Sequence, residues 1–199
     1  VANPNCQTIQ MVVALKPLHD LFVINRIDVT TFQAVSGSGK LAQDELTTQI
    51  GQKLKGETAS LNIYNKQIAF NALPHCGDFE ENSYTQEEMK MVWETHRILD
   101  PNIEVGATCV RVPIVNGHSE SVHVETRELI NIDTVIECLS EAEGINLIQG
   151  EDSESYVTAA EVNGTDLVHV GRLRMDLWSN NRLNLWVVAD NLRKGAALN

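Results

Sequence analysis

The chain has 199 residues, of which 43% are apolar and 21% charged, and its formal net charge is −12. This length predicts one domain, or one large and one small. So acidic a chain, with no local basic patch, argues against nucleic acid or an anionic membrane as a partner. The longest apolar run is far shorter than a membrane span, and no basic segment precedes an apolar stretch. We therefore expect neither a transmembrane helix nor a signal peptide.

The chain contains four cysteines at wide spacing, namely Cys6, Cys76, Cys109 and Cys138. They form no C-x-x-C pair, and they do not cluster with histidines at the spacing that zinc sites use. We therefore predict no metal site. Cysteines used in this way favour a reduced, cytoplasmic location.

The first third of the chain alternates between helical and extended patterns. Apolar residues recur at helical spacing over 6–19, and Asn5 is a good N-cap for that helix. Residues 23–33 alternate as a strand does, and "SGSG" then interrupts the chain. An amphipathic helix is predicted over 40–55, ending at Gly56.

The middle of the chain begins with a turn-rich loop over 71–83. Thr85 and Glu88 form the T-x-x-E pattern of a capping box, so a helix is predicted to begin there. Pro101 is expected to end it, because the residue before a proline disfavours helical geometry.

The second half reads mainly as strands in hairpin-like pairs. Strands are predicted over 106–113 and 119–126, joined around Gly117, and Asp133 is expected to cap a helix that Gly144 closes. Such a mixture of elements predicts an α+β fold, a mostly antiparallel mixed sheet with helices packed on one face.

The end of the chain adds further short strands over 156–190, the clearest being "NLWVVAD". The last residues, "LRKGAALN", read as the start of another helix. The chain also begins just before a helix and has no initiator Met, so we expect it to be a domain of a longer protein.

Cys6 is the first candidate for chemistry, since it falls in the first turn of a predicted helix. The free N–H groups and positive end of the helix dipole would lower the pKa of its thiol and could hold an oxyanion. The alternative is a small buried apolar side chain, which is the usual role of a free cysteine.

Two further candidates lie near the predicted junction of the two strands. His118 stands at a strand entrance beside Gly117, where a histidine can act as a base, although a surface or hydrogen-bonded histidine is the commoner role. Arg111 alternates with Cys109 along its strand, and its guanidinium suits bidentate capture of a carboxylate. An ordinary salt bridge is the alternative for Arg111.

Glu87 and Lys90 are spaced i,i+3 on the capped helix and so share one face. They form either a solvated ion pair or a paired anion and cation reaching into a cleft. The stretch "SGSGK" over 36–40 has the composition of a phosphate loop but matches neither phosphate-binding fingerprint. It could still let the backbone approach a ligand closely.

Taken in order, the motifs "NPNC", "FQAVSGSGK", "AFNALPH", "YTQEEMKMVWETHRIL", "ATCVRVPIVNGHSESVHVET" and "WVVADNLRKGAALN" closely resemble the aspartate-semialdehyde dehydrogenase family. The resemblance runs over the whole chain and includes the seven-residue spacing from Arg111 to His118. It departs from the family at Gln7, where many relatives carry a small hydroxyl residue, and we expect the first helical turn to be altered there.

In that family an N-terminal Rossmann domain binds NADP, and a second domain carries the substrate site and the dimer interface. The resemblance implies that residues 1–199 are that second domain, without the Rossmann domain. Its fold would be that of the C-terminal domain of glyceraldehyde-3-phosphate dehydrogenase. The chain would form a homodimer through its sheet.

The resemblance also implies roles for individual residues. Cys6 would be the nucleophile that attacks the aldehyde carbon of aspartate semialdehyde, and His118 would be the acid/base. After hydride transfer to NADP, phosphate would resolve the thioester to aspartyl phosphate. The implied ligand contacts are Gln33, Glu87 and Arg111 for the substrate, Asn5 and Lys90 for the phosphate, and Ser36, Gly37 and Asn191 for the cofactor.

Two other functions stay open at this point. The chain could be a non-catalytic dimerisation module that retains an idle site. It could also be a cysteine hydrolase that uses Cys6 and His118, although the full set of motifs favours a dehydrogenase. As a dehydrogenase domain on its own, the chain is expected to be nearly inactive.

Overall fold

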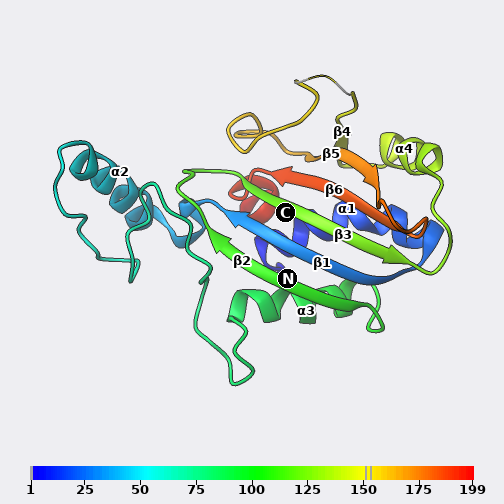
Figure 1. Ribbon diagram of the computed structural model, residues 1–199, viewed down its shortest axis with the longest axis horizontal. Coiled ribbons are helices and arrows are strands. Elements are labelled where there is room, and N and C mark those ends of the chain that lie inside the picture. The colour runs from blue at the N-terminus through cyan, green and yellow to red at the C-terminus, as the bar shows by residue number, and fades with distance from the viewer. Residues whose placement is uncertain (1, 151, 153) are drawn as a thin grey trace.

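The protein is described by a computed structural model that covers residues 2–150, 152 and 154–199. The strands are β1 (Ile24–Gln33), β2 (Glu104–Arg111), β3 (His118–Thr126), β4 (Ile145–Leu147), β5 (Val168–Met175) and β6 (Arg182–Ala189). The helices are α1 (Cys6–Phe22), α2 (Lys40–Leu54), α3 (Gln86–Ile98) and α4 (Ile132–Glu141), with short helical turns η1 (Val35–Ser38) and η2 (Arg193–Ala197). Figure 1 shows this arrangement.

The strands form one six-stranded sheet in the order β2-β1-β3-β6-β5-β4. The pairs β1–β3, β3–β6 and β5–β6 are antiparallel, whereas β1–β2 and β4–β5 are parallel. The predicted mixed, mostly antiparallel sheet is therefore confirmed. The expected hairpin around Gly117 is wrong, because β1 lies between β2 and β3. Local sequence patterns locate strands but do not reveal a pairing made with a strand seventy or more residues earlier.

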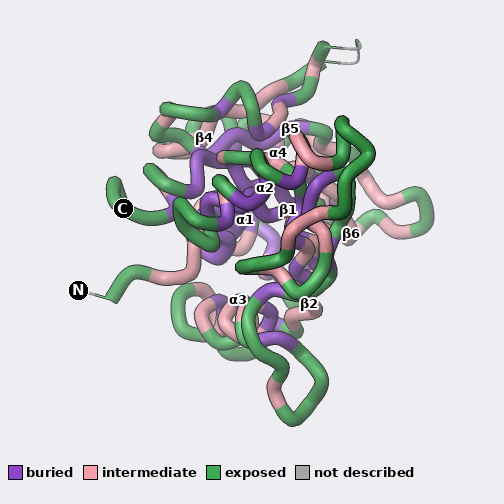
Figure 2. The backbone as a smooth tube through the Cα atoms, turned by 90° about the vertical axis from the view of Figure 1, so that its left-hand side faces the viewer, coloured by how far each residue is buried: buried purple, intermediate pink, exposed green. Residues whose placement is uncertain are grey.

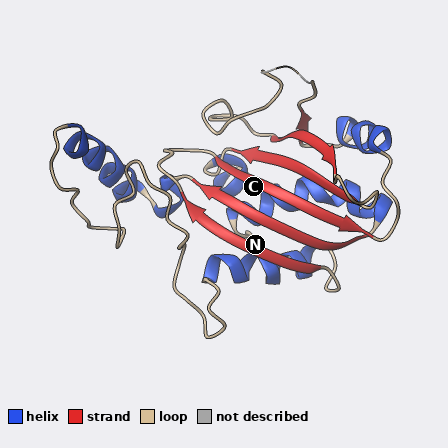
Figure 3. Cartoon of the chain, in the orientation of Figure 1, coloured by secondary structure: helices blue, strands red, loops and turns tan. Residues whose placement is uncertain are grey.

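The helices α1, α3 and α4 cover one face of this sheet, as predicted (Figure 3). The central helix α1 lies against β1, β3, β5 and β6, with α3 beside β2 and α4 beside β4. Met11, Leu15 and Leu18 of α1 are almost fully buried in the main apolar core, which also takes in the helix-facing side chains of the central strands. Figure 2 shows the buried backbone concentrated in α1 and these strands.

The helix starts follow from capping chemistry. Asn5 caps α1 through its side chain, and Thr85 with Glu88 forms the complete capping box of α3, both as predicted. The cap predicted at Asp133 is wrong. Asn131 is the cap of α4, since its side chain accepts the backbone N–H groups of Asp133 and Thr134.

Residues 34–75 form a small lobe that projects from one end of the sheet and contains η1 and α2 (Figure 1). The lobe has its own core around Val35, Leu46 and Ile68. Its loop is held by the buried Gln49, whose Oε1 accepts the N–H groups of Ile68 and Ala69 at 2.9 and 3.1 Å. The lobe thereby fixes the start of η1, which borders the candidate site.

The two ends of the described chain meet beside the start of α1. The side chain of Asn199 donates to Oδ1 of Asn3 at 2.8 Å, and η2 packs on α1. The helix expected at the C-terminus is present only as the short turn η2. Among the described residues, no helix combines the length and the apolar character that crossing a membrane requires.

Candidate active site

Cys6 is the first residue of α1, at the end of the helix that faces the chain termini. Oδ1 of Asn5 accepts the backbone N–H of Gln7 at 3.1 Å, which closes the first turn. The backbone N–H of Asn5 donates to Oε2 of Glu94 at 2.8 Å, so α3 holds the segment that carries the cysteine. The thiol is thus placed by two elements rather than by a free chain end.

The surroundings of the Cys6 thiol favour its protonated form, contrary to the expectation of a lowered pKa. Burial and the negative charge of Glu87 raise its pKa to about 12, although Arg111 and the backbone N–H groups of Cys6 and Gln7 act in the opposite direction. The helix terminus therefore does contribute as predicted, but desolvation outweighs it. A ligand that brought positive charge or withdrew Glu87 would favour the thiolate.

Gly195 of η2 covers the cysteine from the side of the C-terminal turn. A Cβ atom on this glycine would lie 2.9 Å from Cβ of Cys6 and 3.4 Å from its Cα. Such an approach is closer than a side chain tolerates, so only glycine fits here. The C-terminal turn is consequently part of the wall of the site.

His118 begins β3 and is completely buried. Its Nδ1 accepts the backbone N–H of Ala34 at 3.0 Å, and since that group can only donate, the neutral ring carries its proton on Nε2. Burial and the charge of Arg111 lower the pKa of His118 to about 3. Nε2 has no hydrogen-bond partner among the described residues. The ring therefore presents an unused N–H donor.

Arg111 ends β2 beside this histidine and is 7% exposed. Its Nη1 donates to the backbone oxygen of Ala34 at 2.8 Å, and within the described ranges no carboxylate pairs with it. The salt bridge considered as an alternative is therefore not the role of this residue. A buried guanidinium with free donors fits a carboxylate ligand.

Gln33 ends β1, the strand next to Arg111, and is 1% exposed. Its Nε2 donates to Oγ1 of Thr31 at 3.2 Å. Cα of Gln33 is the register partner of Arg111 across the parallel pair. The structure thus brings these two predicted substrate residues together at the same end of the sheet.

Glu87 and Lys90 lie on the first turns of α3 and are joined by an ion pair of 3.0 Å. The other oxygen of Glu87 accepts Nδ2 of Asn5 at 2.5 Å. The hydrogen bond to Glu87 raises the pKa of Lys90. Glu87 therefore links Lys90 to Asn5, the residue directly before Cys6.

The three predicted cofactor residues, Ser36, Gly37 and Asn191, lie together beside His118. Oδ1 of Asn191 accepts the N–H of Gly117 at 2.8 Å, and its Nδ2 donates to Oγ of Ser36 at 3.0 Å. A Cβ on Gly37 would lie 2.9 Å from Nη1 of Arg111 and 3.3 Å from Nε2 of His118. The carboxamide of Asn191 thus ties Ser36 to Gly117, and Gly37 places bare backbone beside the histidine.

Sequence patterns did not reveal every residue that builds this site. Glu94 holds the backbone of Asn5, and its seven-residue spacing from Glu87 places both on one helix face, a signal that was available. No sequence pattern marked Gly195 as part of the site. The sequence also did not show that Glu120 is a fully buried carboxyl, which lies on β3 beside Gln10 of α1.

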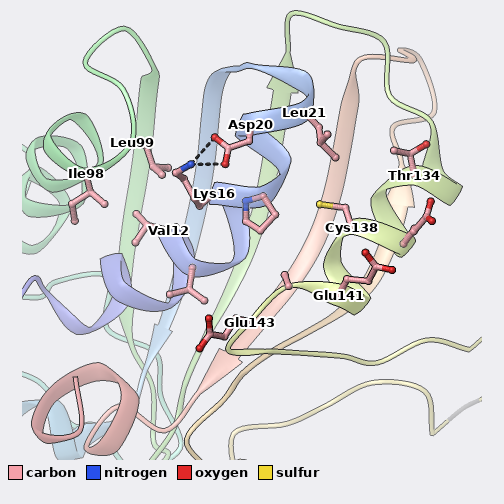
Figure 4. A pocket seen from close by; sticks show the side chains of 14 residues that line it. Val12, Lys16, Asp20, Leu21, Ile98, Leu99, Thr134, Cys138, Glu141 and Glu143 are labelled. Atoms are coloured by element: carbon pink, nitrogen blue, oxygen red, sulfur yellow. Dashed lines mark hydrogen bonds and ion pairs between the residues drawn. The ribbon is translucent and has the colours of Figure 1, made fainter.

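A groove of about 870 Å³ lies elsewhere, between α1, the end of α3 and α4. Figure 4 shows the ion pair of Lys16 and Asp20 and the thiol of Cys138 at this groove. Its walls are mainly apolar, formed by residues such as Val12 and Leu99. None of the predicted site residues lines it, so it is separate from the cysteine site.

These observations define an α+β domain in which one end of a sheet and the start of a helix hold a thiol near a guanidinium, a carboxylate and an ammonium group. Residues 15–194 match the family described as semialdehyde dehydrogenase, dimerisation domain. The chain belongs to this family.

Relatives with curated names support the same assignment. The chain is 53% identical to aspartate-semialdehyde dehydrogenase 2 of Vibrio cholerae serotype O1 over 200 residues, which cover 100% of this chain and 59% of the relative. It is 52% identical to aspartate-semialdehyde dehydrogenase of Legionella pneumophila over 201 residues, covering 100% of this chain and 58% of the relative. The chain therefore spans somewhat over half the length of these curated relatives.

Solved structures show the same fold. The crystal structure of aspartate semialdehyde dehydrogenase II from Vibrio cholerae, complexed with ASA, has a TM-score of 0.96 at 52% identity and covers 100% of this chain and 59% of that one. A structure of aspartate semialdehyde dehydrogenase with NADP from Candida albicans has a TM-score of 0.69 at 23% identity, covering 98% and 53%. The latter likeness concerns the fold alone.

Proposed function

We propose that this chain is the substrate-binding and dimerisation domain of an NADP-dependent aspartate-semialdehyde dehydrogenase. The enzyme interconverts aspartate semialdehyde and aspartyl phosphate through a cysteine thioester. The reaction serves the cytoplasmic synthesis of the aspartate-derived amino acids lysine, threonine and methionine, and of diaminopimelate. The single observation that carries the proposal is the contact chain at the start of α1, where Asn5, next to Cys6, is hydrogen-bonded to Glu87, which is ion-paired with Lys90.

The charges at the site match an amino-acid substrate. The buried guanidinium of Arg111 binds the substrate carboxylate, and Glu87 binds the amino group. Burial is the main cause of the raised pKa of the Cys6 thiol, and binding of the amino group neutralises the second cause, the charge of Glu87. Substrate binding thereby favours the reactive thiolate. Lys90, whose side chain is 44% exposed, is available to the phosphate that resolves the thioester.

His118 acts on the oxygen of the aldehyde. Its Nε2–H donates to that oxygen as the carbon–sulfur bond forms and negative charge develops. The fixed bond from Ala34 to Nδ1 keeps the ring in this tautomer. In the resting site His118 is therefore a donor, and it takes up a proton at Nε2 only after Nε2 has released one.

The residues Ser36, Gly37 and Asn191 would hold the nicotinamide end of NADP, which when bound accepts the hydride released from the adduct carbon. Gly37 leaves backbone, rather than a side chain, against His118. Asn191 keeps Ser36 and Gly117 in place through its carboxamide. Most of the cofactor would bind to a nucleotide-binding domain outside these 199 residues.

The experiment that tests the enzyme proposal measures NADPH formation from aspartate semialdehyde, NADP and phosphate. The 199-residue chain alone is expected to be nearly inactive, and the same chain joined to a nucleotide-binding domain of a close relative is expected to be active. A stable fused enzyme with no activity would overturn the proposed enzyme function. Robust turnover by the isolated chain would overturn the proposal that it is only one domain of the enzyme.

The alternative, a dimerisation module with an idle site, is favoured by the burial that raises the pKa of the Cys6 thiol. Iodoacetamide labelling of Cys6 as a function of pH separates the two functions. In a working site, added aspartate moves the pH at which Cys6 becomes labelled to a lower value, because the amino group of aspartate neutralises Glu87. An idle site shows the same profile with and without aspartate.

A further inference from the structure

The thiol of Cys6 makes its closest side-chain contact with its neighbour Gln7. Sγ donates to Oε1 of Gln7 at 3.1 Å, whereas Oδ1 of Asn5 is 4.0 Å away. Gln7 is 1% exposed, so this contact is sheltered from water. The carboxamide of Gln7 is therefore part of the immediate surroundings of the sulfur.

The other end of that carboxamide is unused. Nε2 of Gln7 is buried and has no hydrogen-bond partner among the described residues. The two heteroatoms of a carboxamide share one carbon, so Nε2 belongs to the same planar group that contacts the sulfur through Oε1. A buried donor without a partner costs about 1–3 kcal/mol, and most such groups in folded proteins find one. An oxygen atom of a ligand bonded to the sulfur would supply the missing acceptor.

We propose that Gln7 is a catalytic residue whose Nε2–H donates to the carbonyl oxygen of the aldehyde that Cys6 attacks. The proposal rests on the proposed function, because it needs an aldehyde at the sulfur. In this step the sulfur–carbon bond forms, the carbonyl π electrons move to oxygen, and the thiol proton ends on that oxygen. The product is a thiohemiacetal, and no further reactant is required.

A single side chain thus contacts both ends of the reacting group. Oε1 accepts the thiol hydrogen before attack, and Nε2 stabilises the charge that develops on oxygen during it. The small hydroxyl residue of many relatives has a shorter reach and one hydrogen to donate. Gln7 therefore gives this chain a donor that the resemblance to the family does not supply.

The test uses the aldehyde to protect Cys6 from alkylation. The chain is incubated with increasing aspartate semialdehyde, labelled briefly with iodoacetamide and quenched, and label on the Cys6 peptide is measured by mass spectrometry. The half-exposed Cys138 in the same sample is an internal control, because it lies in the separate groove. The variant Gln7→Met keeps the length and helix propensity of the side chain but has no N–H donor.

We expect Gln7→Met to need about tenfold more aldehyde for half protection, which corresponds to ~1.4 kcal/mol. The matched control is Thr8→Val, which removes the neighbouring buried hydroxyl, also unpartnered, and should keep wild-type protection. A purely structural role for Gln7 would change labelling of Cys6 without aldehyde but not the concentration that protects it.

The possible outcomes separate the two proposals. Wild-type protection in Gln7→Met overturns the role of Gln7 and leaves the proposed function intact. Absence of protection in the wild-type chain overturns both. If Gln7→Met does not fold, as judged by its melting temperature, Gln7→Leu replaces it with the same expected loss of protection, and retained protection there overturns the role of Gln7.

Discussion

The backbone N–H of Ala34 donates to Nδ1 of His118 at 3.0 Å, and this one contact fixes which nitrogen of the ring carries the proton. We predict that His118→Asn folds well but is inactive, because Oδ1 of asparagine can replace Nδ1 as the acceptor while the Nε2–H donor is lost. Turnover of the enzyme fused to a nucleotide-binding domain is expected to fall by about 10²–10³-fold, the usual loss for an oxyanion donor. Steady-state kinetics measures this, and activity within threefold of wild type would contradict it.

The same substitution is predicted to change acid stability. The pKa of His118 is about 3 in the folded chain and 6.5 ordinarily. Between these values the unfolded chain holds a proton that the folded chain does not, so this residue's contribution to stability is lost as pH falls from 6.5 towards 3, at about 1.4 kcal/mol per pH unit. The difference in urea-unfolding free energy between wild type and His118→Asn should therefore depend on pH in this window and be constant above it.

The close contact between Gly195 and Cys6 allows a test of whether the turn η2 covers the cysteine. We predict that Gly195→Ala lowers stability by about 1–3 kcal/mol and slows alkylation of Cys6, since the added Cβ would press on the cysteine backbone. The control is Gly51→Ala in α2, where no atom lies within 4 Å and the change should stabilise by about 0.5–1 kcal/mol. Equal behaviour of the two variants in thermal unfolding and labelling would show that η2 does not cover Cys6.

The sequence predicted those features that depend on residues close together in the chain, such as the helix caps. Caps are decided within one helical turn, so Asn5 and the box of Thr85 and Glu88 were found correctly. Asp133 was mistaken for a cap because Asn131, two residues earlier, has the same chemistry and comes first. The set of candidate site residues came from the resemblance to a family, since each was a weak signal alone.

Long-range placement was the part that sequence could not predict. The parallel pairing of β1 with β2 joins residues more than seventy positions apart, and no local pattern encodes it. The pKa of the Cys6 thiol depends on how deeply the folded chain buries it and on Glu87 from another helix. For the same reason the buried Glu120 was not recognised, because only the packing of α1 on β3 removes it from water.

Glu120 carries the fourth prediction. Its carboxyl is fully buried, both oxygens lack partners among the described residues, and burial raises its pKa well above the ordinary 4.5. Above pH 4.5 the unfolded chain releases this proton and the folded chain keeps it, so stability is lost as pH rises. Glu120→Gln stays neutral in both states, and we expect it to be more stable than wild type by at least about 1 kcal/mol at pH 7.

Urea unfolding at several pH values checks the role of Glu120. The advantage of Glu120→Gln should shrink as pH falls and vanish below 4.5, where the wild-type carboxyl is protonated in both states. Glu45→Gln serves as the comparison, since that buried carboxylate accepts the N–H groups of Asn62 and Ile63 and should lose stability on substitution. An advantage for Glu120→Gln that does not depend on pH would contradict a protonated Glu120.

The last prediction concerns the proposed homodimer and the face of the sheet that the helices α1, α3 and α4 do not cover. The described helices α1, α3 and α4 cover the opposite face, and Ser121, in the middle strand β3, is exposed together with Thr108 of β2. The half-buried rings of Phe32 and Trp186 meet on this face at 5.6 Å, where Trp186 also packs on Val157 and Ala159. We predict that Ser121→Arg converts a dimer to a monomer at micromolar concentration, because two-fold pairing of this face would bring bulky like charges together.

Sedimentation velocity measures the change, with Thr48→Arg on the exposed surface of α2 as the matched control that should remain dimeric. A dimeric Ser121→Arg variant, or a wild-type chain that is monomeric throughout, would rule out pairing through this face.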